Sequence, residues 1–302
     1  MGFFSKKNKE PVQDEESYDY DREYEVEENH SLPLDTANIT QAKKTLLFRL
    51  NLAAAIFQTL SAVGIFLLIV FGKENDGITF YTNYPKPLEE DVEGRPDVGP
   101  DAQPQFTINI GWLSGTFLAL SALDHLLVCS VCKGPYERGL SRNFNVFRWV
   151  EYAFSASIMR VIVGSLSGMI DLHMQFLNFG LAAVTMLFGL IFELENKKKR
   201  LTAPGEIRWY LYWIGFIPHI FSWTVVIGFF FYSLSTNKPP TFVYAIIGII
   251  FTLDLTFAIV LGLQWRAKGC FRPYVNGEIA FIILSFTSKN LLAWINFFGG
   301  NA

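Results

Sequence analysis

Seven long apolar stretches constrain the fold of this chain more than any other feature of its sequence. Hydrophobic residues make up 51% of its 302 residues, and an apolar run of about 18 residues or more can cross a bilayer core as a helix. We therefore predict an all-α membrane protein, a seven-transmembrane-helix bundle in one domain over residues 44–298. The predicted helices span approximately residues 45–72, 109–132, 144–170, 174–194, 207–233, 241–265 and 277–298.

Lysine and arginine residues gather in alternate connections between these stretches. The connections "DLHM" and "SLSTNKPP" hold a single lysine, Lys238, whereas the segments between them are basic. Because cytoplasmic loops retain positive charge, we predict a multi-pass integral membrane protein with a cytoplasmic amino terminus and an extracellular end at residues 299–302. The basic residues are Lys43, Lys44 and Arg49; Lys133, Arg138, Arg142 and Arg148; Lys197 to Arg200 and Arg208; and Arg266, Lys268 and Arg272.

Residues 1–43 have a different composition. The stretch "PVQDEESYDYDREYEVEEN" is acidic and nearly free of aliphatic side chains, a composition that cannot bury a core. We predict a disordered cytoplasmic tail. On the same predicted side lie Cys129, Cys132 and Cys270, which we expect to be free thiols, with neither a disulfide nor a metal site.

The first extracellular loop, residues 73–108, is the only long connection between the predicted helices. It contains "GITFYTNY" and the start of "QFTINIGW", two short alternating runs separated by a stretch rich in Pro, Gly and acidic residues. This pattern predicts a small β-hairpin that caps the outer end of the bundle, with an irregular loop as the equal alternative.

One lysine lies deep within an apolar stretch. If the last helix begins near Val275, Lys289 is roughly 21 Å along it at 1.5 Å per residue. A buried lysine must lose its charge, pair with a carboxylate or form a Schiff base. Glu151 is the best partner, provided that the third helix begins at Ser141, and Ser285 lies one turn before the lysine on the same face.

Other ionisable residues receive different interpretations. We expect Arg160 to reach toward water or Asp171, and Glu193 and Glu278, near the cytoplasmic ends of their helices, to be hydrated. Asp124 and Asp254 remain candidate acids. Ser155 and Met159 share a helical face with Glu151, while Trp209, Trp213 and Trp223, with Phe216 and Phe221, could line an elongated apolar ligand.

The stretches "RWVEYAFSASIM", "SFTSKNLLAWINF", "FRLNLAAAIFQ" and "SALDHLLVC" together resemble the heliorhodopsin family over about residues 44–298. The resemblance implies that Lys289 binds all-trans retinal as a protonated Schiff base, that Glu151 is its counterion and that Ser285 replaces a second carboxylate. His125 matches a family histidine, whereas Gln58 stands where relatives carry another. We assign Ser155, Met159, Phe154 and Trp223 to the ligand wall, and His125, Gln58, Asp124, Asp254 and Glu193 to a proton network.

Three classes of function remain open at this point. The resemblance favours a photosensor, not an enzyme, that signals to a cytoplasmic partner; the alternative is a light-gated proton or ion channel. Ile162 lies three turns after Glu151, at the position where a light-driven pump with the usual internal proton donor would have an acidic residue, and this argues against pumping. A retinal-free receptor or membrane enzyme is the third class, but catalytic and receptor motifs are missing. We expect membrane lipids as partners, no nucleic acid, and a homodimer through the fourth and fifth helices, as the resemblance implies.

Overall fold

The computed structural model describes residues 39–72, 77–87, 98–236 and 238–300. Most of the predicted tail lies outside these residues, and its last three positions belong to the first described helix, α2 (Gln41–Phe71). Thr40 caps this helix by accepting a hydrogen bond from the Lys43 N–H.

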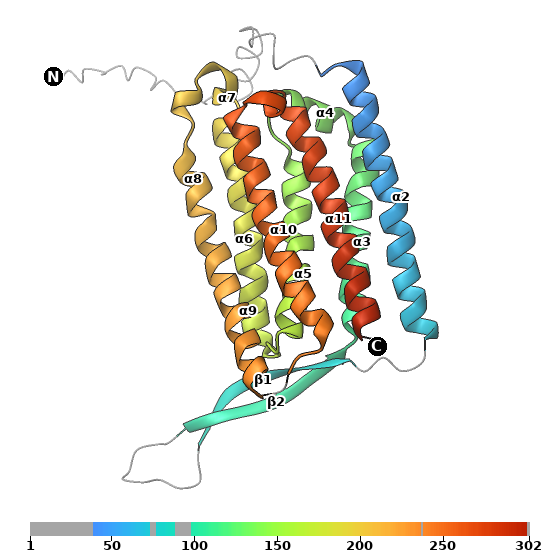
Figure 1. The fold of residues 1–302 in the computed structure, drawn as a ribbon, viewed down its shortest axis with the longest axis vertical. Coiled ribbons are helices and arrows are strands. Elements are labelled where there is room, and N and C mark those ends of the chain that lie inside the picture. The colour runs from blue at the N-terminus through green and yellow to red at the C-terminus, as the bar shows by residue number, and fades with distance from the viewer. Residues whose placement is uncertain (1–38, 73–76, 88–97, 237, 301–302) are drawn as a thin grey trace, which may run out of the picture.

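Long helices run side by side through the molecule, with a two-stranded sheet at one end and short helices at the other (Figure 1). We call these the hairpin end and the α4 end. The remaining elements are β1 (Ile78–Pro87), β2 (Val98–Ile108), α3 (Ile110–Cys129), α4 (Lys133–Ser141), α5 (Val146–Leu166), α6 (Leu172–Asn196), α7 (Lys199–Thr202), η1 (Pro204–Glu206), α8 (Trp209–Ile214), α9 (Phe216–Thr236), α10 (Thr241–Arg266), η2 (Gly269–Phe271) and α11 (Tyr274–Gly300).

Six helical spans among the described residues are long and apolar enough to cross a membrane: α2, α3, α6, the α8–α9 pair, α10 and α11. The 21-residue α5 is long enough, but its sequence includes Arg148, Glu151 and Arg160. It packs against α3 and α6, and α3 also contacts α2 and α11. The charged helix is therefore an inner member of the bundle.

The fifth predicted helix is divided into α8 and α9 at Gly215. Pro218 stands three residues later and has no backbone N–H with which to bond the carbonyl of Ile214. The helix therefore loses its regular ladder at this point, where α8 meets α9.

The hairpin predicted in the first loop is present. Strands β1 and β2 pair antiparallel from Ile78 opposite Ile108 to Pro87 opposite Val98, with a bulge between Phe80 and Tyr81. The second strand begins seven residues earlier than the run from Gln105 indicated, and its prolines are tolerated because a two-stranded ribbon has free edges.

The hairpin is held to the bundle through the connection between α5 and α6. Tyr81 donates its N–H to the carbonyl of Ile170 at 3.0 Å, and Asn83 donates to Asp171 Oδ2 at 2.8 Å. Partial burial raises the pKa of Asp171, but hydrogen bonds from the Met174 N–H and Asn83 outweigh it, so the net pKa lies below its usual 3.8. Asp171 thus joins two elements as a carboxylate.

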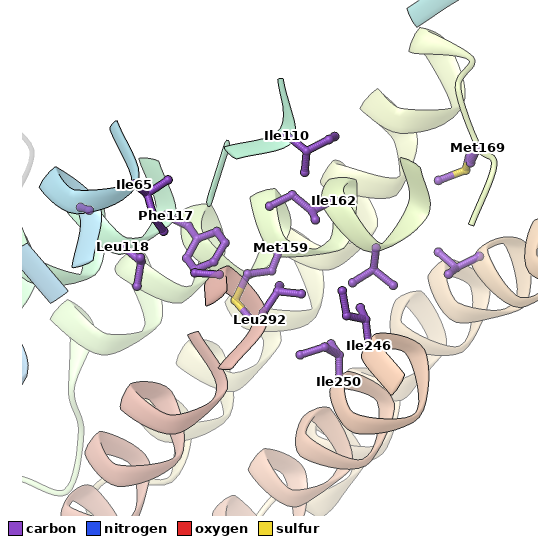
Figure 2. Packing of buried hydrophobic residues seen from close by; sticks show 14 of the residues in the cluster. Ile65, Ile110, Phe117, Leu118, Met159, Ile162, Met169, Ile246, Ile250 and Leu292 are labelled. Carbon is purple, nitrogen blue, oxygen red and sulfur yellow. The ribbon is translucent and has the colours of Figure 1, made fainter. Parts of the chain in front are cut away.

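The half of the bundle nearest the hairpin has a largely apolar core. Ile65, Phe117, Leu118, Ile162 and Leu292 are each 0% exposed and come from α2, α3, α5 and α11. Figure 2 shows these side chains packed with Met159, Ile246 and Ile250. We call the five fully buried residues the dry layer.

Candidate functional site

Lys289 on α11 and Glu151 on α5 form a buried ion pair. The lysine Nζ donates to Glu151 Oε1 at 2.6 Å and Oε2 at 2.7 Å, and to Ser121 Oγ on α3 at 3.0 Å. It also lies 5.0 Å from the centre of the Tyr152 ring. Lys289 is 2% exposed and Glu151 is 9% exposed. Charges this deep persist in a membrane protein when they are paired.

The pair forms without the early helix start that the sequence argument required. Helix α5 begins at Val146, capped by the Asn145 side chain, which accepts the Arg148 N–H at 3.2 Å. Ser141 instead ends α4, where its hydroxyl donates to the Arg138 carbonyl. This corrects the prediction. Glu151 and Lys289 still meet because a helical side chain leans toward the amino end of its helix, which brings the lysine toward the α4 end.

A cavity opens beside Lys289 and extends between α5, α6, α8, α9 and α10. It holds about 910 Å³ of space between its atoms, including its open mouth. Its wall is largely apolar and aromatic, and the lysine is at one side. The lining includes Trp149, Tyr152, Ser155, Met159, Met186, Gly189, Phe192, Tyr212, Phe216, His219, Asp254, Phe257, Leu261, Phe281 and Lys289.

Gly189 gives this cavity part of its width. A Cβ atom at this position would lie 2.3 Å from the Trp149 ring, far inside van der Waals contact. The indole therefore lies directly against the α6 backbone. Ser155 Oγ faces the same cavity and has no hydrogen-bond partner among the described residues.

The residues predicted to form a ligand wall lie in different surroundings. Ser155 and Met159 line the cavity. Trp223 is buried behind it and donates its Nε1–H to Asp254 Oδ2 at 3.1 Å. Phe154 is 56% exposed on the outer surface of α5. The structure corrects its assignment, because residue 154 projects to the side of α5 that faces away from the neighbouring helices.

The fifth predicted helix also presents a different face from the one its tryptophans suggested. Leu211, Tyr212, Gly215, Phe216 and His219 line the cavity. Trp213 and Phe221 are 62% and 60% exposed, and Trp209 packs against Phe192 and Tyr212.

A second, smaller cavity lies on the α4 side of Glu151 and is polar. Its lining brings together Asp124, His125 and Ser285, along with Asn51, Tyr136, Asn145, Arg148, Glu151 and Glu278. His125 Nδ1 and Asn51 Oδ1 are 2.7 Å apart. Ser285 therefore belongs to this polar cavity, and the hydroxyl that contacts Lys289 is that of Ser121.

Two other predicted members of a proton network, Gln58 and Asp254, do not line this cavity. Gln58 is 0% exposed on α2, and neither atom of its amide has a hydrogen-bond partner among the described residues. Asp254 forms an ion pair with Arg160, whose guanidinium lies 4.1 Å from the Trp223 ring. The expectation that Arg160 reaches water or Asp171 is wrong, because α10 supplies a carboxylate closer to it.

Arg148 is the centre of a buried cluster of charged side chains that was not predicted from the sequence. Its guanidinium pairs with Glu193 on α6 and Glu278 on α11. Tyr274 donates to Glu193 at 2.9 Å, and Asn145 Nδ2 donates to Glu278 at 2.8 Å. The two glutamates are 0% and 2% exposed, so the expectation that they are hydrated is wrong. The available signal was an arginine inside the helix, three residues before Glu151.

Comparison with known proteins agrees with the resemblance described above. A family model described as heliorhodopsin matches residues 47–300, which include every side chain of the two cavities. No curated protein matches the chain.

Proposed function

The chain belongs to the heliorhodopsin family, and from this premise we propose that it is a light-sensing retinal protein. We also propose that α5 crosses the membrane together with the six apolar spans, which makes seven transmembrane helices in all. Every charged side chain of α5 has a partner inside the bundle: Arg148 with Glu193 and Glu278, Glu151 with Lys289, and Arg160 with Asp254. The helix can therefore cross a bilayer without exposing a charge to lipid.

The residues of the large cavity fit a retinal chromophore. Lys289 supplies the amine for a Schiff base at one side of an apolar, aromatic-lined cavity, and Glu151 holds the compensating negative charge. Bound all-trans retinal would supply a light-driven change of shape. Trp149 and Gly189 set the width of the cavity, and the ion pair between Glu151 and Lys289 orients the amine.

One observation carries the sensor function: polar and dry surroundings lie on opposite sides of Lys289. Toward the α4 end are Asp124, His125 and Glu278 in the polar cavity. Toward the hairpin end is the dry layer, in which Ile65, Phe117 and Leu292 are fully buried. A proton that leaves the lysine region therefore meets an apolar layer on the hairpin side and titratable groups on the α4 side, and this asymmetry supports a conformational signal in place of net transport.

The charge distribution supports a cytoplasmic α4 end. Basic side chains in the first turns of α2 and in the segments around α4, α7 and η2 lie at this end, which the positive-inside rule assigns to the cytoplasm. The carboxyl terminus is then extracellular, and a signalling partner would bind the α4 end. The homodimer through the fourth and fifth helices, α6 and α8–α9, stays a prediction.

The polar cavity also gives the channel alternative its one argument. It connects Glu151 with Glu278 and so leads toward the α4 end. Conduction would still require water to cross the ion pairs of Arg148 on one side and the dry layer on the other.

Two measurements test the proposal. Wild-type protein incubated with all-trans retinal should form a visible absorption band that Lys289→Ala abolishes, whereas the exposed Lys238→Ala should keep it. Under voltage clamp, light should evoke no current in cells that express the pigment. An unchanged band in Lys289→Ala would refute the chromophore site, and a current that follows the proton gradient would favour the channel.

A further inference from the structure

A third cavity, separate from the two around Lys289, lies at the α4 end where the described chain begins. It holds about 930 Å³, including its opening, and three basic residues line it: Lys43 on α2, Arg200 on α7 and Arg272 just after η2. Its described lining includes no acidic residue. The cavity therefore has the charge of a binding site for an anion.

Arg200 carries the strongest evidence for this site. It is 1% exposed, and within the described residues its hydrogen bonds go to neutral oxygens. Its guanidinium donates to the carbonyls of Gln264, Phe271 and Arg272 at 2.7 to 3.0 Å, and to Asn143 Oδ1 at 3.4 Å. Burial lowers the pKa of Arg200 to about 10, because Tyr274 and Glu193 offset only part of the desolvation. A negative group in the cavity would restore this balance.

The chain itself supplies such a group. Ile39 and Thr40 line the cavity, and the sequence that precedes them has nine carboxylates between Asp14 and Glu28, against one arginine. Glu28 is 11 residues from Ile39, and an extended chain of this length reaches up to about 36–40 Å. The acidic segment can therefore reach any part of the cavity.

We propose that the acidic segment, residues 14–28 of this chain, binds in the basic cavity formed by Lys43, Arg200 and Arg272. A tethered segment acts at an effective concentration on the order of millimolar, an advantage that a lipid headgroup or a partner protein lacks. The proposal does not depend on retinal.

Carbodiimide crosslinking of the full-length protein tests this contact, because the reagent joins a carboxylate to an amine that it touches. Mass spectrometry should find crosslinks from residues 14–28 to Lys43 in excess over Lys133 and Lys268, two lysines at the same end but outside the cavity. High salt, which shortens the Debye length to about 3 Å, should remove this excess. Equal crosslinking of all three lysines would overturn the proposal.

A titration separates the segment from other anions. A labelled peptide of residues 11–30 is added to a full-length variant whose nine carboxylates are replaced by amides, in nanodiscs of phosphatidylcholine. The peptide should bind this variant about tenfold or more tightly than it binds wild type, whose own segment competes. Adding Lys43→Gln and Arg272→Gln should weaken it again, while the visible band with retinal reports folding. Equal binding to all three proteins, or displacement by phosphatidylserine in the nanodisc, would overturn the proposal.

Discussion

Replacing Gly189 by alanine adds a single methyl group at the point where α6 touches the cavity wall. That carbon would lie 2.3 Å from two atoms of the Trp149 ring, whereas ordinary contacts begin at 3.4 Å. The indole must therefore move by roughly 1 Å, and overpacking of this kind costs about 1–3 kcal/mol. Tyr152, Phe281 and Arg148 enclose the other sides of the ring, so the ring can retreat only into the cavity.

The cost should appear in retinal binding. At 1.4 kcal/mol per factor of ten, we expect Gly189→Ala to raise the retinal concentration for a half-maximal visible band by about 5- to 150-fold. The matched control is Gly180→Ala on the same helix, where a Cβ atom meets nothing within 4 Å. Both variants gain about 1 kcal/mol of helix propensity, so their difference isolates the clash. If Gly189→Ala bound retinal as well as Gly180→Ala does, the assignment of the cavity to retinal would fail.

Three further predictions concern the charged groups. Arg148→Met should lower the free energy of unfolding by about 3–5 kcal/mol, because Glu193 and Glu278 stay buried without a cation. Denaturant unfolding measures this free energy, and adding Glu193→Gln and Glu278→Gln to the variant should restore most of the lost stability. Glu151→Gln should shift the visible band to longer wavelength in an absorption spectrum, because a negative charge beside the chromophore is lost; an unshifted band would exclude Glu151 as the counterion. The folded state lowers the pKa of Asp171, so the stabilisation by this carboxylate is present above pH 3.8 and is lost as the pH falls through the lower pKa of the folded state. Hydrogen exchange at the Tyr81 amide should become faster as this stabilisation is lost, and Asp171→Asn should remove the pH dependence.

The ion pair of Lys289 and Glu151 could be predicted from sequence because a membrane sets a common scale of depth. Helix length and rise place Lys289 far from water, and few acids are candidates for its partner. The predicted start at Ser141 was wrong, yet the pairing was right. Side-chain lean supplies the reach that the sequence argument sought from a longer helix.

Burial near the helix ends could not be predicted in the same way. Glu193 and Glu278 lie close to their helix termini in the sequence, which favoured hydration. In the structure, Tyr136 on α4 and Tyr274 on α11 hydrogen-bond to them and Arg148 lies between them. Only the three-dimensional path of the chain across the α4 end brings these side chains over the two glutamates and buries them. The hairpin was easier, because its alternating strands carry a local signal.

The dry layer also determines where a membrane voltage acts. An electric field drops mainly across apolar material, and Ile65, Phe117, Leu118, Ile162 and Leu292 form a fully buried apolar layer in the half of the bundle nearest the hairpin. Lys289 and Glu151 lie on the α4 side of this layer, so part of the membrane voltage falls beyond them. Moving a unit charge through a tenth of a 100 mV potential difference takes only about 0.2 kcal/mol. The colour of the pigment should therefore respond little to the voltage of the membrane that contains it.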